Sequence, residues 1–293
     1  MTQPDRLAAT VAEARKPRDD EIDVWGLTHP GKVRQTNNDH FLLGAVHKRL
    51  DVRLTSLPEA QLSLGAERLA FLAMVADGVG GTAKGGEASR LALQVVTEYV
   101  ASSMQAYYGG DAGGEKFIES LQDAAMRCHA EVVRRGAEHD ALRGMATTLT
   151  LVIGVWPWAY LLQVGDSRYY RYRDGTLTLV TRDQTMAQEL LDQGVFTRTD
   201  AFQSKWAHVL SSSIGGQQTA PVVTRLRSDW QTVHLMCSDG LTGHVSDDRI
   251  RERLAAMTSA RQACEDLLQD ALDGGGSDNI TIIVGRTVPK APL

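Results

Sequence analysis

The chain has 293 residues, of which 43% are hydrophobic and 23% charged, and its formal net charge at pH 7 is -5. This composition is ordinary for a folded globular protein with one large domain or two small ones. The acidic balance argues against a nucleic-acid-binding surface, and no stretch is long and apolar enough to span a membrane. The three cysteines lie far apart, which predicts neither a disulfide framework nor a zinc site.

The first 21 residues are polar and mixed in charge, and they contain no apolar core segment. This pattern predicts a solvated N-terminal tail without a signal peptide, so we expect a cytoplasmic protein. Strands are expected over 22–26 and 41–46, with a turn at Pro30-Gly31 between them. Residues 47–68 predict an extended excursion or hairpin with an exposed tip.

An unbroken apolar run over 69–76 ends on Asp77-Gly78 and predicts a strand buried on both faces. The strand would hold the Asp77 carboxylate rigidly, and the glycines after it would let a main-chain carbonyl approach a ligand. Such oxygen-only ligation suits Mg²⁺ or Mn²⁺. The same residues also fit a buried strand followed by an ordinary Asp-Gly turn that binds no metal.

The remaining periodicities predict two long helices, then hairpins, then a second pair of helices. Helical spacing begins near Gly86 and again near Phe117. Strands are expected over 147–155, 159–164, 169–172, 177–180, 222–226, 232–237 and 280–284. Short helices are expected over 186–193, 247–257 and 260–272. Hairpins in place of regular strand–helix alternation predict an α+β fold with largely antiparallel sheets.

Five aspartates stand at the ends or edges of these strands, each beside Gly, Asn or Ser: Asp39, Asp77, Asp166, Asp239 and Asp278. Carboxylates that converge repel one another and raise each other's pKa unless a cation neutralises them. Two divalent ions roughly 3.5–4 Å apart are the usual solution, and they activate a water for attack on phosphorus. The pattern therefore predicts a metal-dependent hydrolase.

Six short motifs follow one another in the chain: Arg34-x-x-Asn37-Asn38-Asp39, Val75-Ala-Asp-Gly-Val-Gly-Gly81, Thr147-Thr148, Gly165-Asp-Ser-Arg168, Cys237-Ser-Asp-Gly240 and Ser277-Asp-Asn-Ile-Thr281. In these motifs the chain resembles the metal-dependent PPM family of protein serine/threonine phosphatases, the protein phosphatase 2C-like group, of bacterial type. The resemblance implies a four-layer α-β-β-α sandwich, with two mainly antiparallel central sheets flanked by helix pairs. It implies a phosphatase domain over 22–286 with a flap over about 183–211, followed by a C-terminal tail over 287–293.

The resemblance also implies a metal centre with two Mn²⁺ or Mg²⁺ ions. Asp77 would bridge the two ions, and the Gly78 carbonyl would bind one of them. Asp239 and Asp278 would complete the other site. Asp166, together with Asp239, would hold a third and weaker ion.

Two more residues receive roles from the resemblance. Asp39 would act on the metal-bound waters, and Arg34 would hold the substrate phosphate, for which a guanidinium offers a fixed fork of donors. The implied reaction is hydrolysis of phosphoserine and phosphothreonine in proteins by a metal-bridged hydroxide, without a covalent phosphoenzyme. The implied partners are phosphorylated proteins, including a bacterial serine/threonine kinase and its substrates. The protein is expected to be a monomer that binds neither nucleic acid nor a membrane.

Some features leave alternatives open. Val79, Thr82 and Gln184 stand where many family members have histidine, so the acid for the leaving group is not identified. A non-catalytic phosphoprotein-binding module and a two-metal phosphatase of small phosphate esters remain alternative functions. Cys128-x5-Arg134 matches the bare pattern of cysteine-dependent phosphatases, but it is expected inside a helix, where the backbone N–H groups cannot cradle a phosphate.

Overall fold

The computed structural model describes residues 15–48, 54, 67–80, 83–107 and 114–290. Within these residues, two five-stranded sheets are built from antiparallel pairs only. The first sheet has the order β1 (Ile22–His29), β10 (Ile280–Thr287), β9 (Val233–Cys237), β6 (Arg168–Arg173) and β7 (Thr176–Leu179). The second has the order β2 (Asp39–Lys48), β3 (Glu67–Asp77), β4 (Leu149–Val155), β5 (Trp158–Val164) and β8 (Val222–Arg227).

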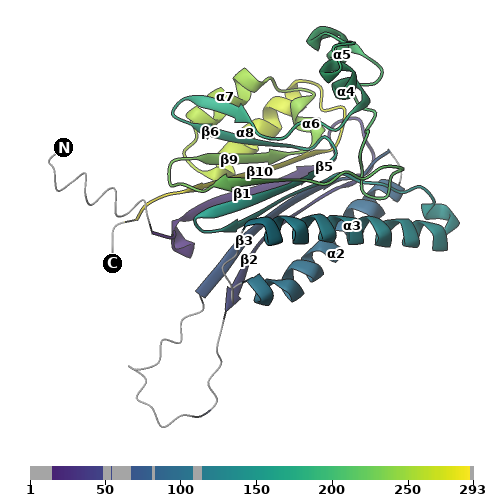
Figure 1. Cartoon of the computed structure of the whole chain (residues 1–293). Coiled ribbons are helices and arrows are strands. Elements are labelled where there is room, and N and C mark those ends of the chain that lie inside the picture. The colour runs from purple at the N-terminus through teal and green to yellow at the C-terminus, as the bar shows by residue number, and fades with distance from the viewer. Residues whose placement is uncertain (1–14, 49–53, 55–66, 81–82, 108–113, 291–293) are drawn as a thin grey trace.

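Helices cover the outer face of each sheet, as Figure 1 shows. The long helices α2 (Ala83–Tyr107) and α3 (Gly114–Glu138) lie on the second sheet. The helices α7 (Asp247–Ala255) and α8 (Ala260–Asp273) lie on the first sheet, next to the short α6 (Asp239–Thr242). Two 3₁₀ turns, η1 (Asp19–Glu21) and η3 (Asp140–Leu142), complete these layers. The predicted four-layer α+β sandwich is confirmed.

Three apolar clusters hold the layers together, because each strand alternates its side chains between two faces. One cluster lies between α2, α3 and the second sheet, and another lies between α6, α7, α8 and the first sheet. The third lies between the two sheets and has Val75, Leu161, Tyr169, Met236 and Ile283 at its centre.

The strand β3 confirms the prediction of a strand buried on both faces. It pairs with β2 on one side and β4 on the other. Leu72 and Met74 point into the helix-covered cluster, whereas Ala73 and Val75 point into the layer between the sheets. The strand ends on Asp77, so the position of that carboxylate is fixed by the middle of the sheet.

The segment predicted as a flap contains two helices instead of one, α4 (Met186–Asp192) and α5 (Arg198–Gln203). They stand beyond one end of the sandwich (Figure 1). The extra helix begins with a capping box, in which the Thr197 side chain accepts from the Asp200 N–H and the Asp200 carboxylate accepts from the Thr197 N–H. The capping box stabilises the start of this helix. The helix lacks the apolar periodicity by which it could have been predicted from the sequence.

The predicted tail over 1–21 differs from the structure in residues 15–21, which pack against the sandwich. Arg15 lies 4.7 Å from the centre of the Trp230 ring, and the Trp230 indole N–H donates to the Arg15 carbonyl. Glu21 is only 1% exposed and accepts from the Arg15 guanidinium. Ion pairs, the buried Glu21 carboxylate and the buried Pro17 hold this segment, and its low hydrophobicity gave no signal of this packing in the sequence.

The chain's other expected features have mixed outcomes. The predicted C-terminal tail begins inside β10, which continues to Thr287, and the Lys290 N–H donates to Glu21. The excursion expected over 47–68 falls mostly outside the described residues, as does Thr82. In the part of the chain that is described, no helix has both the length and the apolar character needed to cross a bilayer.

Candidate metal and phosphate site

Two carboxylates face each other across the β2–β3 pair at one end of the sandwich. Asp39 begins β2 and Asp77 ends β3, and the two residues are direct partners in the register. Like charges directly opposite each other destabilise a sheet, so this pair calls for a cation or a proton. Burial is the main cause that raises the pKa of both groups, to about 6 for Asp39 and well above the usual range for Asp77.

Asp39 is held by hydroxyl groups from the other sheet. Ser238 and Thr281 both donate to Asp39 Oδ2 at 2.7 Å. The second oxygen, Oδ1, is buried and has no hydrogen-bond partner among the described residues. Asp39 is 3% exposed, so one oxygen orients the carboxylate and the other is left for a ligand that brings positive charge or a donor.

Asp77 has a fixed backbone and a free carboxylate. The Asp77 N–H donates to the Thr148 hydroxyl at 3.0 Å, and its carbonyl accepts from the Thr148 N–H and the Thr147 hydroxyl, each at 2.8 Å. No described side chain donates to the carboxylate. The next residue, Gly78, approaches the backbone so closely that an added Cβ would lie 2.3 Å from Gly85. The Thr147-Thr148 motif thus positions Asp77 through the main chain.

Asp239 and Asp278 reach the same end of the sandwich from β9 and β10. Asp239 is the first residue of α6, directly after Ser238, and Asp278 lies two residues before β10 begins. Asn279 fixes the second of these turns, because its amide donates to the carbonyls of Pro30 and Thr36. The loop that carries Arg34 is therefore tied to the loop that carries Asp278.

Arg34 meets Asp278 in a two-pronged ion pair. Arg34 Nε lies 2.9 Å from Asp278 Oδ1 and Nη2 lies 2.7 Å from Oδ2. Gly31 makes this approach possible, since its φ is +80° and an added Cβ would lie 2.2 Å from the Asp278 carbonyl oxygen. Both side chains remain partly exposed, at 41% and 37%, so substrate or metal can reach them.

Asp166 is the fifth carboxylate at this end, and it is 8% exposed. Burial, followed by the Asp239 and Asp183 carboxylates, raises the pKa of Asp166 well above its usual range. Arg168 does not neutralise Asp166, because its guanidinium binds Asp183, with Nη2 2.7 Å from Oδ2. Among the described residues Asp166 therefore has no ion-pair partner, whereas His208 lies near Asp239, with Nδ1 3.7 Å from Oδ2.

These residues suit hard divalent cations. Among the residues that the structure describes, no three His, Cys, Asp or Glu side chains gather closely enough to hold an ion as they stand. Mg²⁺ usually takes one or two protein carboxylates and keeps several waters, so two of these carboxylates are enough to hold it. The buried, unpartnered Asp39 Oδ1 and the unpaired Asp77 and Asp166 carboxylates are the oxygen donors that such an ion needs.

The site opens into a cleft of about 970 Å³ between the carboxylates and the flap. Arg34, Asp77, Gly78, Asp166, Asp239 and Asp278 all line it, whereas Asp39 lies beneath its floor. The opposite wall includes apolar flap residues such as Leu191 and Leu210. The structure thus brings every predicted site residue to one end of the molecule.

Sequence reasoning missed His208. It lies on the flap with Nδ1 3.7 Å from Asp239 Oδ2, and this carboxylate raises the pKa of His208. The polar segment around it carries no local signal that would have placed it here. Ser238 and Thr281 were inside recognised motifs, but only the pairing of the two sheets shows that both donate to Asp39.

Three further residues, Gln184, His40 and Cys128, have structural roles. Gln184 is buried, accepts from the Gly165 N–H at 2.8 Å and donates to the Ala220 carbonyl at 2.9 Å. His40 Nδ1 lies 2.8 Å from the Ser89 hydroxyl and links β2 to α2. Cys128 is fully buried in α3, and burial raises the pKa of its thiol to about 12, which removes it as a nucleophile.

Comparison with known proteins identifies the family of the chain. The family model described as Protein phosphatase 2C matches residues 62–274. The serine/threonine protein phosphatase PstP of Mycobacterium tuberculosis is 34% identical over 220 residues, which are 75% of this chain and 41% of PstP. The chain thus spans less than half the length of that relative. A serine/threonine phosphatase of Listeria welshimeri is 27% identical over 73% of this chain and 83% of its own length.

Solved structures extend the similarity beyond the matched segment. A crystal structure of M. tuberculosis PstP has a TM-score of 0.72 and 28% identity, covering 92% of this chain and 99% of its own. A PstP catalytic domain in complex with two manganese ions has a TM-score of 0.70 and 29% identity, with the same coverage of both chains. Arg34, Asp39 and Asp278 lie outside residues 62–274, so their placement rests on the fold.

Proposed function

Because the chain belongs to the protein phosphatase 2C family, we propose that it hydrolyses phosphoserine and phosphothreonine in proteins with Mn²⁺ or Mg²⁺ as cofactor. One observation carries the proposal: Asp77 and Asp166, which have no ion-pair partner among the described residues, line one cleft together with the guanidinium of Arg34. The relatives named as serine/threonine phosphatases and the manganese-bound PstP structure support it.

We assign the metal ligands as follows. Asp77, with the Gly78 carbonyl, would hold one ion and share a second with Asp239 and Asp278, and these three carboxylates would move closer together when that ion binds. Asp166 and Asp239 would hold a third, weaker ion, in keeping with the charge of Asp239 acting on Asp166. When bound, the ions would supply activation of water and neutralisation of the phosphate charge.

The chain's own residues would position the substrate. Arg34 would turn its two donors from Asp278 to the phosphate oxygens, which match the same fork. Ser238 and Thr281 would keep Asp39 oriented beneath the reacting phosphate. The flap would close the opposite side of the cleft and contact residues that flank the phosphorylated side chain.

The wider assignments belong to the same proposal. The phosphatase domain would extend over residues 22–286, with residues 15–21 packed against it. Its partners would be phosphorylated proteins, among them a bacterial serine/threonine kinase and the substrates of that kinase. It would act as a monomer.

Phosphate release from a phosphothreonine peptide tests the proposal. We would compare the chelated protein, the same protein with Mn²⁺ restored, and two variants. Asp239→Asn removes a proposed ligand, and Asp248→Asn is the matched control, because Asp248 has an 88% exposed side chain on α7. We expect Mn²⁺ to restore turnover in the wild type and the control, and not in Asp239→Asn.

Two other results would favour the alternatives. Binding of the phosphopeptide without turnover under any metal would indicate a phosphoprotein-binding module. Faster hydrolysis of a small phosphate ester than of the peptide, compared as kcat/KM, would indicate a phosphatase of small esters. Loss of activity in Asp248→Asn would show that the assay reports on folding and not on the metal site.

A further inference from the structure

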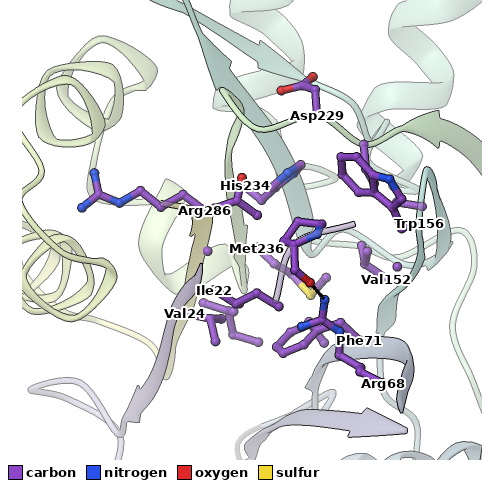
Figure 2. Close-up of a pocket in the computed structure, with 18 of the residues that line it drawn as sticks. Ile22, Val24, Arg68, Phe71, Val152, Trp156, Asp229, His234, Met236 and Arg286 are labelled. Carbon is purple, nitrogen blue, oxygen red and sulfur yellow. Dashed lines mark hydrogen bonds between the residues drawn. The ribbon is translucent and has the colours of Figure 1, made fainter. Parts of the chain in front are cut away.

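A second cavity lies between the two sheets, at the end of the sandwich away from the carboxylates. Its volume is about 170 Å³. The layer between the sheets starts at Asp39 and Asp77, continues through the apolar cluster around Val75 and Leu161, and reaches this cavity. Figure 2 shows Phe71 and Val152 from one sheet and Val24 and Met236 from the other around it. The cavity and the cleft are thus the two ends of one layer.

Small residues leave this space open. Ala73, Gly154 and Ala159 lie on the inner face of the second sheet, and Gly285 lies opposite them on β10. A Cβ added at Gly154 would meet only Phe71 atoms, at 3.8 and 3.9 Å. Well-packed interiors have few voids larger than a water molecule, so a space of this size is unusual for a core.

The cavity wall is mostly apolar, and its uncharged polar side chains are Tyr169, Ser228, His234 and Thr287. His234 lies on β9, and its Nδ1 is 2.6 Å from the Tyr169 hydroxyl. Burial, together with the nearby Arg171 guanidinium, lowers the pKa of His234 to about 4. The ring is therefore neutral at pH 7 and has one donor and one acceptor nitrogen. Its Nε2 has no partner among the described residues, so one hydrogen-bonding position is unused.

The charged residues at the rim are already paired. Arg68 Nη1 lies 2.8 Å from Asp19 Oδ1, and Arg286 Nε lies 3.0 Å from Asp23 Oδ2. Asp229 accepts from Arg171 at 3.1 Å. Lys16, the remaining charged residue of the lining, has its Nζ 3.7 Å from Glu67 Oε1. Since these charges are paired within the protein, the rim offers no free charge to an anion or a cation. A ligand that fits here is neutral.

The size of the cavity sets the size of that ligand. An engineered apolar cavity of about 150 Å³ stays dry and binds benzene. Phe71, Trp156 and Met236 add aromatic and thioether surface, which favours a ring. We propose that the cavity between the sheets is a binding site for a neutral single-ring aromatic molecule that carries one hydroxyl group, for which phenol is the probe.

Binding of phenol to the full chain would be measured by isothermal titration calorimetry and by NMR of methyl-labelled methionine. Ala159→Leu fills the cavity from β5, and Ala256→Leu places the same change at an exposed position after α7. We expect phenol to bind the wild type and Ala256→Leu equally, and Ala159→Leu at least tenfold more weakly. We also expect phenol to shift the Met236 methyl signal, which Met236→Leu identifies.

A third variant tests the hydrogen bond. In His234→Phe, phenol should lose affinity relative to benzene, whereas the wild type should prefer phenol. Equal binding to Ala159→Leu and Ala256→Leu would overturn the proposal by placing phenol elsewhere. A Met236 methyl signal that does not move at saturating phenol would also overturn the proposal and would leave water as the occupant of the cavity. This readout uses the wild type, so it holds even if Ala159→Leu fails to fold.

Discussion

The ion pair between Arg34 and Asp278 predicts that removal of Arg34 tightens metal binding while it weakens catalysis. Both oxygens of Asp278 are engaged by the guanidinium, at 2.9 and 2.7 Å. A cation that takes Asp278 as a ligand must displace at least one of these bonds. Under the proposed function, the arginine would therefore compete with the metal for the carboxylate before it binds the phosphate.

The exposure of the pair sets the size of the effect. With side chains 41% and 37% exposed, the pair is worth about 0.2–1 kcal/mol, as is usual for solvent-accessible ion pairs. Since 1.4 kcal/mol corresponds to a factor of ten, the Kd for Mn²⁺ should fall by a factor of about 1.4 to 5 in Arg34→Ala. Arg34→Lys keeps the charge but loses the fork of donors, so its Kd for Mn²⁺ should lie between those of the wild type and Arg34→Ala.

Calorimetric titration of the chelated proteins with Mn²⁺ gives the affinities, and phosphopeptide hydrolysis at saturating Mn²⁺ gives the activities. The two measurements should move in opposite directions, because Arg34→Ala gains metal affinity and loses the phosphate anchor. A Kd for Mn²⁺ that is unchanged or higher in Arg34→Ala would refute the competition.

Three other predictions concern protonation and the cysteine. The folded-state pKa of Asp39, about 6, exceeds the usual 3.8, so ionisation of Asp39 destabilises the metal-free protein as pH rises through 6. The rise in Tm caused by Mn²⁺ should therefore grow between about pH 5 and pH 7 in scanning calorimetry, and a constant rise would contradict this. Glu21 has its pKa lowered to about 2, so its stabilisation is complete above 4.5 and is lost as pH falls toward 2. Glu21→Gln should lower Tm at pH 7, with a smaller difference from the wild type near pH 3, and an equal difference at both pH values would be inconsistent. Cys128→Ser should retain phosphatase activity at saturating Mn²⁺, whereas a complete loss in a folded variant would reopen a cysteine mechanism.

The sequence predicted those parts of the site that depend on strand ends. Asp77 and Asp239 follow apolar runs that could only be buried strands, and such strands end at the edge of a sheet. We expected the aspartates to converge because several strands of this kind end on an aspartate. The two-sheet arrangement came from the family resemblance, because periodicity identifies strands but not their order across a sandwich.

Contacts between distant segments could not be predicted in the same way. The hydroxyls of Ser238 and Thr281 reach Asp39 across about 200 residues of sequence or more, through the packing of two sheets. His208 reaches Asp239 from a polar flap without apolar periodicity. The cavity between the sheets depends on small residues from different strands that happen to share one face, which no local pattern records.

The contacts of Glu21 determine where the protein can be attached to a surface or fused to another domain without blocking its cleft. Residues 15–21 and 288–290 meet at one pole, through the bonds from the Val288 and Lys290 N–H groups to Glu21. The cleft lies at the other pole, beyond the eight residues of β1, a span of roughly 26 Å at 3.3 Å per residue. A surface, label or fused domain linked at Lys290 would therefore leave the cleft facing solvent, so immobilised protein should dephosphorylate large substrates as readily as small ones.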